Sequence, residues 1–390
     1  MTEFSRLTRG LRTGIDTDTA HGAVVPPMYL SSNFSFEGLG MGRTYDYSRS
    51  GNPTRDQLAD ALATLEGGFG AVVTSSGMSA VTLVALALGS GGTIVIPHDC
   101  YGGTWRLFTH LAARGLIRLE TIDFTDTAQL AGLGDLHPDV VWLETPSNPL
   151  LRITDIAEAA RVAHAAGALV VADNTFCSPL LQRPLALGAD VVVHSTTKYI
   201  NGHSDVVGGA VVAGSEELQE KLAFWANTLG VTGAPFDSYL TLRGVRTLSA
   251  RMRVHLENAR AVVDLLTSHP AVSAVHYPGL PDHPGHELAS RQQEDFGAIV
   301  SFELAGGRDA VARAVQGLRC FTLAESLGGI ESLVAHPASM THASMTPEAQ
   351  EQAGITEGLL RLSVGIEGAT DLVNDLREAL DRSAADGNQP

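Results

Sequence analysis

Lysine is nearly absent from this chain of 390 residues: Lys198 and Lys221 are its only two, and arginine supplies the remaining Lys+Arg total. Positive charge is scarce overall: 26 lysines and arginines stand against 43 acidic residues, which gives a formal net charge of −17. That balance argues against nucleic acid or an anionic membrane surface as the main partner. An anionic ligand would therefore be held by local donors. A lysine retained in such a chain is informative.

Cysteine and long apolar runs are scarce as well. Cys100, Cys177 and Cys320 are odd in number and far apart, which predicts no disulfide framework and a reducing, cytoplasmic setting. The N-terminal residues lack an apolar stretch, so we expect no signal peptide. The most apolar run, 80–88, stops at a glycine-rich turn and is too short to span a bilayer.

Short apolar runs alternate with helical patterns between residues 59 and 250. This order predicts a doubly wound, mostly parallel α/β sheet, whose sites lie beyond the carboxyl ends of the strands. The expected strands are 70–74, 92–97, 139–144, 168–173, 190–195 and 208–213, and the expected helices include 57–66, 79–88, 154–167 and 217–230.

Two flanking regions differ from this large domain. Residues 251–390 predict a smaller C-terminal α+β domain that closes with a helix near 370–384; the long helical pattern at 238–266 leads into it. Residues 1–58 look irregular and rich in turns, with little core of their own. We expect an N-terminal arm that lies on another surface, such as that of a second subunit.

The segment HSTTKYINGHSD (194–205) places Lys198 directly after an apolar strand. A buried lysine whose pKa is lowered can act as a Schiff-base nucleophile, and hydroxyls such as those of Ser195 and Thr197 suit phosphate oxygens. The competing interpretation is a solvated surface charge, the usual fate of a lysine. The preceding strand and the rarity of lysine favour the chemical role.

Other expected strand ends also carry polar groups. SSGMS (75–79) joins a strand to a helix and is either an anion-binding turn or an ordinary connection. Asp173 ends a buried strand, as a helix cap or as a partner for a protonated heterocycle. Glu144 and Asn148 follow another strand in ETPSNP. Phosphate donors, a pyridinium partner and a Schiff-base lysine at one sheet edge together predict a pyridoxal phosphate (PLP) site.

Competing site types have weaker signals. GLGMG (38–42) lacks the spacing of a dinucleotide-binding turn and follows no strand. HPGH (283–286) has no frame typical of a zinc site, and no GxSxG elbow is present. Cys100 is more readily a packed small side chain than a nucleophile.

Several motifs together resemble one family. HSTTKYINGHSD, YSRSGNPT (47–54), SSGMSA (75–80), ETPSNP (144–149) and SLGGIESL (326–333) resemble the PLP-dependent enzymes of cysteine and methionine metabolism, which have fold type I (aspartate-aminotransferase-like). The resemblance runs from about residue 20 to about residue 380. The stretches 98–108, 225–244 and 321–345 resemble the γ-synthase branch of this family.

The resemblance implies a cofactor role for a set of residues. Lys198 would bind the cofactor aldehyde and later move protons, Asp173 would keep the pyridine nitrogen protonated, and Tyr101 would stack on the ring. Tyr47 and Arg49 would reach the cofactor of a neighbouring subunit, so a homo-oligomer, usually a tetramer in this family, is part of the expectation. The remaining cofactor ligands would be Gly77, Met78, Thr175, Ser195 and Thr197.

The resemblance also implies the substrates. Arg361 would hold the substrate α-carboxylate through its guanidinium fork. Arg106 would face the distal carboxylate, and Glu325 would orient an amino group; Asn148 and Ser326 complete the set. The reaction implied is γ-replacement in methionine biosynthesis: L-cysteine and O-succinyl-L-homoserine would give L-cystathionine and succinate.

Alternatives on the same scaffold stay open. They are cystathionine γ-lyase and an O-acyl-homoserine sulfhydrylase. Glu325 disfavours a β-lyase, and Gly103 stands where methionine γ-lyases typically carry a cysteine. An inactive PLP-binding subunit is a further alternative, which the intact set of Lys198, Asp173, Tyr101 and Arg361 disfavours.

Overall fold

The computed structural model describes residues 4–343 and 345–384. In this part of the chain, seven strands form a large sheet in the order β1-β7-β6-β5-β4-β2-β3, and β7 alone among them runs antiparallel to its neighbours. The strands are β1 (Gly70–Thr74), β2 (Thr93–Pro97), β3 (Arg118–Ile122), β4 (Val140–Glu144), β5 (Leu169–Asp173), β6 (Val191–His194) and β7 (Gly209–Ala213).

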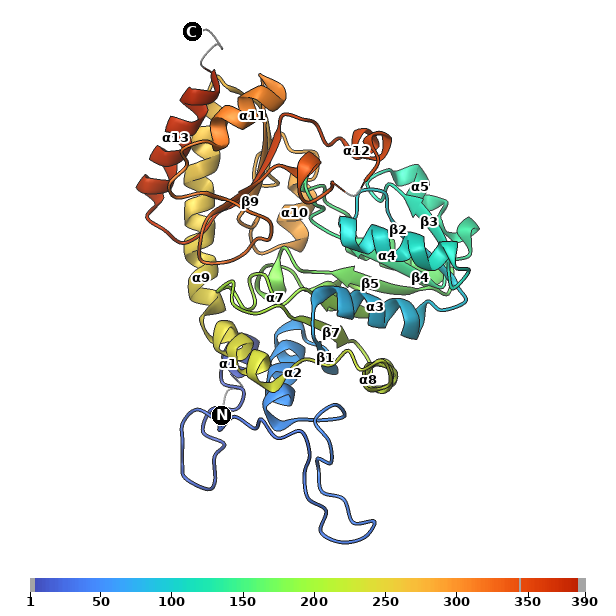
Figure 1. Ribbon diagram of the computed structural model, residues 1–390. Coiled ribbons are helices and arrows are strands. Elements are labelled where there is room, and N and C mark those ends of the chain that lie inside the picture. Colours follow the sequence, from blue (N-terminus) through green and yellow to red (C-terminus); the bar gives the residue numbers. More distant parts are fainter. Residues whose placement is uncertain (1–3, 344, 385–390) are drawn as a thin grey trace.

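Helices cover both faces of the large sheet, so its central strands are buried on both sides (Figure 1). One face packs against α3 (Gly77–Leu88), α4 (Gly102–Ala113) and α8 (Glu216–Leu229). The other face packs against α2 (Pro53–Glu66), α5 (Thr127–Ala131) and α6 (Ile156–Ala165). Strands buried in this way read as continuous apolar runs, which is why they could be recognised from the sequence.

A second sheet forms the core of the C-terminal part. Its order is β10-β11-β12-β9-β8. Its strands are β8 (Val272–His276), β9 (Ile299–Leu304), β10 (Thr322–Leu323), β11 (Leu333–Ala335) and β12 (Leu359–Ser363). The long helix α9 (Pro235–Ser268) contributes to the cores of both sheets (Figure 1). It therefore runs straight through residue 250, where the sequence suggests that one domain ends.

The remaining helices are short or lie at the surface of the second sheet. They are α1 (Arg6–Leu11), α7 (Ser178–Leu181), α10 (His286–Gln292), α11 (Gly307–Val315), α12 (Pro347–Ala353), α13 (Ala369–Ala384) and the 3-10 turns η1 (Leu133–Leu136), η2 (Pro184–Leu187) and η3 (Pro337–Ser339). Of the helices in the described ranges, none is both long and apolar enough to cross a membrane.

The structure departs from the sequence-based expectation in three places. Residues 6–11 form α1 inside the region read as irregular; Ser5 caps it by accepting a hydrogen bond from the Thr8 amide. Helix α2 starts at Pro53 because Asn52 accepts bonds from two amides of its first turn. Strand β3 was not predicted, because its position at the sheet edge leaves Arg118 and Glu120 exposed and removes the apolar run.

The fold class inferred from the sequence is confirmed: the large sheet is mostly parallel and helices cover both of its faces. The chain between α1 and α2 extends away from both sheets as a long loop (Figure 1). Its side chains are mostly exposed.

Candidate active site

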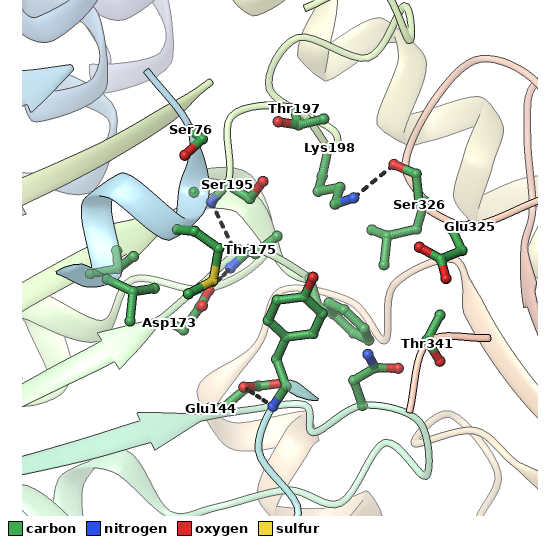
Figure 2. Close-up of a pocket in the computed structure, with 18 of the residues that line it drawn as sticks. Ser76, Glu144, Asp173, Thr175, Ser195, Thr197, Lys198, Glu325, Ser326 and Thr341 are labelled. Atoms are coloured by element: carbon green, nitrogen blue, oxygen red, sulfur yellow. Dashed lines mark hydrogen bonds between the residues drawn. The ribbon is translucent and has the colours of Figure 1, made fainter. Parts of the chain in front are cut away.

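A cavity of about 410 Å³ lies at the carboxyl ends of β4, β5 and β6, where the large sheet meets the second sheet. Figure 2 shows side chains from both parts of the chain pointing into it. Among the residues singled out in the sequence, those that line the cavity are Gly77, Met78, Tyr101, Glu144, Asn148, Asp173, Thr175, Ser195, Thr197, Lys198, Glu325, Ser326 and Arg361.

Lys198 projects into the cavity from the turn that follows β6, and its Nζ donates a 2.7 Å hydrogen bond to Ser326 Oγ (Figure 2). Burial lowers the pKa of this amine to about 8, and the positive charge of Arg361 adds to the effect, while Glu325 opposes it. About a tenth of the amine is therefore unprotonated at pH 7, far more than for an ordinary lysine. Such an amine can act as a nucleophile or as a base.

Asp173 ends β5, half-buried in the cavity wall (Figure 2). Burial raises the pKa of this carboxyl, and hydrogen bonds from the side chain and backbone of Thr175 and the charge of His194 act against that rise. Among the described residues, no lysine or arginine stabilises its charge. A buried carboxylate of this kind suits a cationic ligand group, such as a protonated pyridine nitrogen.

Glu144 is the neighbour of Asp173 in the strand register. Burial and the nearby charge of Asp173 raise the pKa of Glu144 well above its usual value. Its Oε2 accepts a 2.9 Å hydrogen bond from the backbone amide of Tyr101. Glu144 thus holds the start of α4, and with it the residue expected to stack on the cofactor ring.

The N-terminus of α3 forms another side of the cavity. Ser76 caps the helix by accepting a bond from the Ser79 amide, and Gly77 is the first helical residue. A Cβ on Gly77 would come within 2.8 Å of Ser195, so glycine allows the helix end to approach the β6 turn closely. Helix N-termini attract phosphate groups, and the Ser195 side chain stands beside this one.

Tyr101 precedes α4 and lines the cavity with its ring. A Cβ on Gly103 would come within 2.5 Å of the Tyr101 ring and 2.9 Å of Met78 Sδ. Gly103 therefore leaves room for the ring in its present position. The sequence marks Gly103 only as a departure from the methionine γ-lyase pattern, and the structure adds a packing reason for it.

Arg361 reaches the cavity from β12 of the second sheet. The guanidinium donates through Nη1 to Asn148 Oδ1 at 2.9 Å and through Nη2 to the Ser326 carbonyl at 2.8 Å. Burial lowers its pKa to about 10, so it remains charged at neutral pH. Within the described part of the chain, its buried Nε has no hydrogen-bond acceptor. A carboxylate would satisfy this group.

Three of the singled-out residues lie outside the cavity wall. Tyr47 and Arg49 are exposed in the loop before α2, with the guanidinium 5.7 Å from the tyrosine ring centre. Arg106 is exposed on α4. Burial and Glu325 raise the pKa of Tyr101, and the positive charge of Arg106 lowers it. Arg106 therefore lies near the cavity without lining it.

Sequence reasoning missed several residues of the wall. Phe176, Val207 and Thr341 line the cavity. Phe176 lies three residues after Asp173, and its proximity to a strand end was an available signal. Thr341 comes from the loop after β11, whose return to this edge no local pattern indicates (Figure 2).

Residues 7–381 match the family described as Cys/Met metabolism PLP-dependent enzyme. Cystathionine gamma-synthase of Escherichia coli (strain K12) is 54% identical over 95% of this chain and 96% of the relative. Cystathionine beta-lyase of Lactococcus lactis subsp. cremoris is 46% identical over 96% and 98%. The structure of cystathionine gamma synthase from Xanthomonas oryzae pv. oryzae in complex with cystathionine aligns with a TM-score of 0.97 and 62% identity, covering 98% of this chain and 99% of that one.

These likenesses extend over nearly the whole chain and include the architecture, so the fold is fold type I, as the sequence predicts. The cofactor predicted from the strand ends, pyridoxal phosphate, is confirmed as well. This chain belongs to the family of PLP-dependent enzymes of cysteine and methionine metabolism.

Proposed function

We propose that the chain catalyses γ-replacement, in which O-succinyl-L-homoserine and L-cysteine give L-cystathionine and succinate. The observation that carries this proposal is the position of the Lys198 amine, with its pKa of about 8, in one cavity with the buried carboxylate of Asp173 and the buried guanidinium of Arg361. The reaction type follows the γ-synthase relatives, one of which was solved in complex with cystathionine.

The residues present fit the cofactor. A carboxylate without a lysine or arginine partner, an amine that is partly unprotonated and a helix N-terminus at a glycine meet the needs of its ring nitrogen, aldehyde and phosphate. Tyr101 is placed to cover the ring. In this proposal the phosphate contacts come from Gly77, Met78, Ser195 and Thr197, with Thr175 supporting Asp173.

When bound, pyridoxal phosphate supplies an aldehyde that forms imines with amines and a ring that withdraws electrons from the substrate α-carbon. Lys198 would have two tasks: its Nζ would hold the aldehyde before substrate arrives and would take the α-proton afterwards. A base works best when its pKa lies near the working pH, as that of Lys198 does. Asp173 would stabilise the proton on the ring nitrogen throughout.

Arg361 orients the substrate by binding its α-carboxylate, and Asn148 holds the guanidinium in place. Removal of a second proton, at Cβ, allows the Cγ–O bond to break, and succinate leaves with the electron pair. The L-cysteine sulfur would then form the new bond to Cγ as its thiol proton is released, and the protons taken from Cβ and Cα would return to those carbons. Glu325 and Ser326 face this side of the cavity, and Arg106 lies outside its wall, where a distal carboxylate would extend.

A neighbouring subunit completes the site in this proposal. Tyr47 and Arg49 are too exposed to serve the cavity of their own chain, and the loop that carries them has little contact with either sheet (Figure 1). A homo-oligomer, with a dimer as its smallest active unit and a tetramer as the full assembly, would give these residues a phosphate to bind. The three cysteines are unpaired, which supports a cytoplasmic setting.

The test compares two reactions of the purified protein. A visible band of the bound cofactor, and its fixation to Lys198 by borohydride, are expected first; without them the cofactor chemistry fails. We then expect cystathionine to form from O-succinylhomoserine and cysteine faster than cysteine is released from cystathionine. Faster release would assign the chain to the γ-lyases, and sulfide as the preferred nucleophile would assign it to the sulfhydrylases.

A further inference from the structure

Behind the cavity, on the opposite face of the large sheet, lies a buried polar cluster that the proposed reaction does not use. We call it the rear network; its members are Glu66, Asn174, Gln182 and His194. All four are buried, with exposed fractions of 2% or less. Buried polar groups are costly unless they are hydrogen-bonded, so a cluster this deep needs a structural or functional reason.

Glu66 is the centre of the rear network. As the last residue of α2, it accepts bonds at Oε1 from His194 Nε2 at 2.7 Å and from Asn174 Nδ2 at 2.9 Å. Gln182 extends the network: its Nε2 donates to Asn174 Oδ1 and to the Thr145 carbonyl. Three strand ends are thereby joined, since Thr145 follows β4, Asn174 follows β5 and His194 ends β6.

The same three strand ends carry the cavity residues. Asp173 is paired with Glu144 on one side and with Val193 on the other, and all three line the cavity. Side chains alternate between the two faces of a strand, so Asn174 and His194 point to the rear. The core clusters agree, because Val193 packs on the α3 face and Val192 packs on the α2 face.

Electrostatics link the two faces. Burial raises the pKa of Asp173, and the charge of His194 partly offsets that rise. Burial lowers the pKa of Arg6 on α1, and the negative charge of Glu66 partly offsets that lowering. Glu66 Oε2 and His194 Nδ1 have no hydrogen-bond partner in the described part of the chain, so the imidazole depends on its one contact with Glu66, and Glu66 binds both of its donors through Oε1.

We propose that Glu66 is a positioning residue: through Asn174 and His194 it fixes the ends of β5 and β6, and with them Asp173 and Ser195, against the cofactor. This inference rests on the proposed function. It predicts that loss of the carboxylate misplaces groups that contact the cofactor, although Glu66 itself lies on the far side of the sheet. Substrate recognition by Arg361, on the second sheet, is left unchanged.

The test replaces Glu66 by Ala and measures cofactor affinity, kcat and KM in the holoenzyme. We expect the cofactor Kd to rise about tenfold, the effect of roughly one hydrogen bond, and kcat to fall between about tenfold and a hundredfold, as for small misplacements. KM should stay within about twofold, since uniform binding is untouched. The visible band of the bound cofactor should also titrate at a different pH from that of the unaltered enzyme.

A matched control lies at the other end of β6. Asp190 precedes this strand and accepts bonds from His164 Nε2 at 2.9 Å and from the Val170 amide at 2.7 Å. Asp190→Ala also removes a carboxylate–imidazole pair from the sheet, but away from the cavity. We expect it to lower the melting temperature without changing the cofactor Kd or kcat. Equal effects of the two variants on Kd and kcat would overturn the proposal.

Two further variants keep the test decisive if Glu66→Ala does not fold. Glu66→Gln retains an acceptor for both donors and should keep near-normal cofactor affinity, whereas Glu66→Asp is too short to reach both and should not. Unaltered affinity in Glu66→Asp would overturn the proposal. If the unaltered protein itself fails to bind the cofactor, the proposed function fails instead, so the two failures are distinguishable.

Discussion

The loop before α2 and the carboxyl edge of the large sheet hold cofactor candidates in opposite surroundings. At the sheet edge, Asp173 and Lys198 are placed by strands of their own chain and are largely buried. In the loop, Tyr47 and Arg49 are exposed, as are many apolar neighbours. The exposed large apolar side chains of this loop include Val24, Val25, Tyr29, Leu30, Phe36, Leu39 and Met41.

This difference separates two ways of building a site. The groups of the sheet edge are positioned within one chain, because its own hydrogen bonds and burial already set their places and shift their pKa values. The loop exposes apolar surface that a soluble monomer would ordinarily cover, which is typical of a surface awaiting a partner. Helix α2 connects the two regions, since it begins after Asn52 in the loop and ends at Glu66 behind the sheet edge.

The largest effect is expected from a substitution at the sheet edge alone, Lys198→Arg. Lys198→Arg keeps a positive charge but cannot provide an unprotonated amine, because the pKa of a guanidinium is too high. We expect the fold to persist and kcat to fall at least roughly a thousandfold, the loss of a base and nucleophile. Steady-state kinetics and circular dichroism would check this. Lys221→Arg, which changes the other, exposed lysine on α8, should leave kcat unaltered.

The sheet edge was also the part most accessible from the sequence. Asp173, Ser195 and Lys198 could be predicted because each follows a buried apolar strand, and parallel strands bring their carboxyl ends together. Thr341 and Glu66 could not, because each meets its partners only through long-range packing; Glu66 and His194 are 128 residues apart. Strand β3 escaped detection because Arg118, Glu120 and Thr121 are exposed at its edge of the sheet, so it has no apolar run.

The loop follows a different rule. Its exposure and turn-rich sequence predict an arm that covers the surface of another chain. Helix α1, just before this loop, shows how a local signal can be missed, since it has only six residues and one side-chain cap, Ser5. A test of the arm must therefore involve two chains.

A smaller effect is expected when chains altered at the sheet edge are mixed with chains altered in the loop. Chains carrying Lys198→Arg are co-expressed with chains carrying Arg49→Ala, each inactive or weak alone. Hybrid pairs would contain one site with an intact lysine and an intact arm, so we expect about a quarter of the unaltered activity at equal mixing. A cystathionine assay of the unfractionated mixture would measure it, and tagged purification of the hybrid should raise the value to about half.

The control for this mixture uses two changes at the sheet edge. Lys198→Arg with Asp173→Asn should give no recovery, because both residues serve the cavity of their own chain. Recovery in this control, or none in the first mixture, would contradict the division of roles between arm and edge.

The smallest expected effect sharpens the electrostatic side of the comparison. Glu325 raises the pKa of Lys198 against the larger lowering by burial and Arg361. Glu325→Gln should therefore move this pKa below about 8. Only the unprotonated amine condenses with the cofactor aldehyde, so uptake of the cofactor by the apo-protein rises with pH through this pKa, and the midpoint should shift to lower pH in the variant.

The rate of cofactor uptake across a pH series measures that midpoint. Glu303→Gln, on β9 and absent from the groups that influence Lys198, is the matched control and should leave it in place. Arg49→Ala should leave the midpoint in place too, even where it slows uptake, because the arm is expected to act on the phosphate and not on the amine. A shift to higher pH in Glu325→Gln, or an equal shift in all three variants, would show that the charge of Lys198 is not set by its own chain's sheet edge.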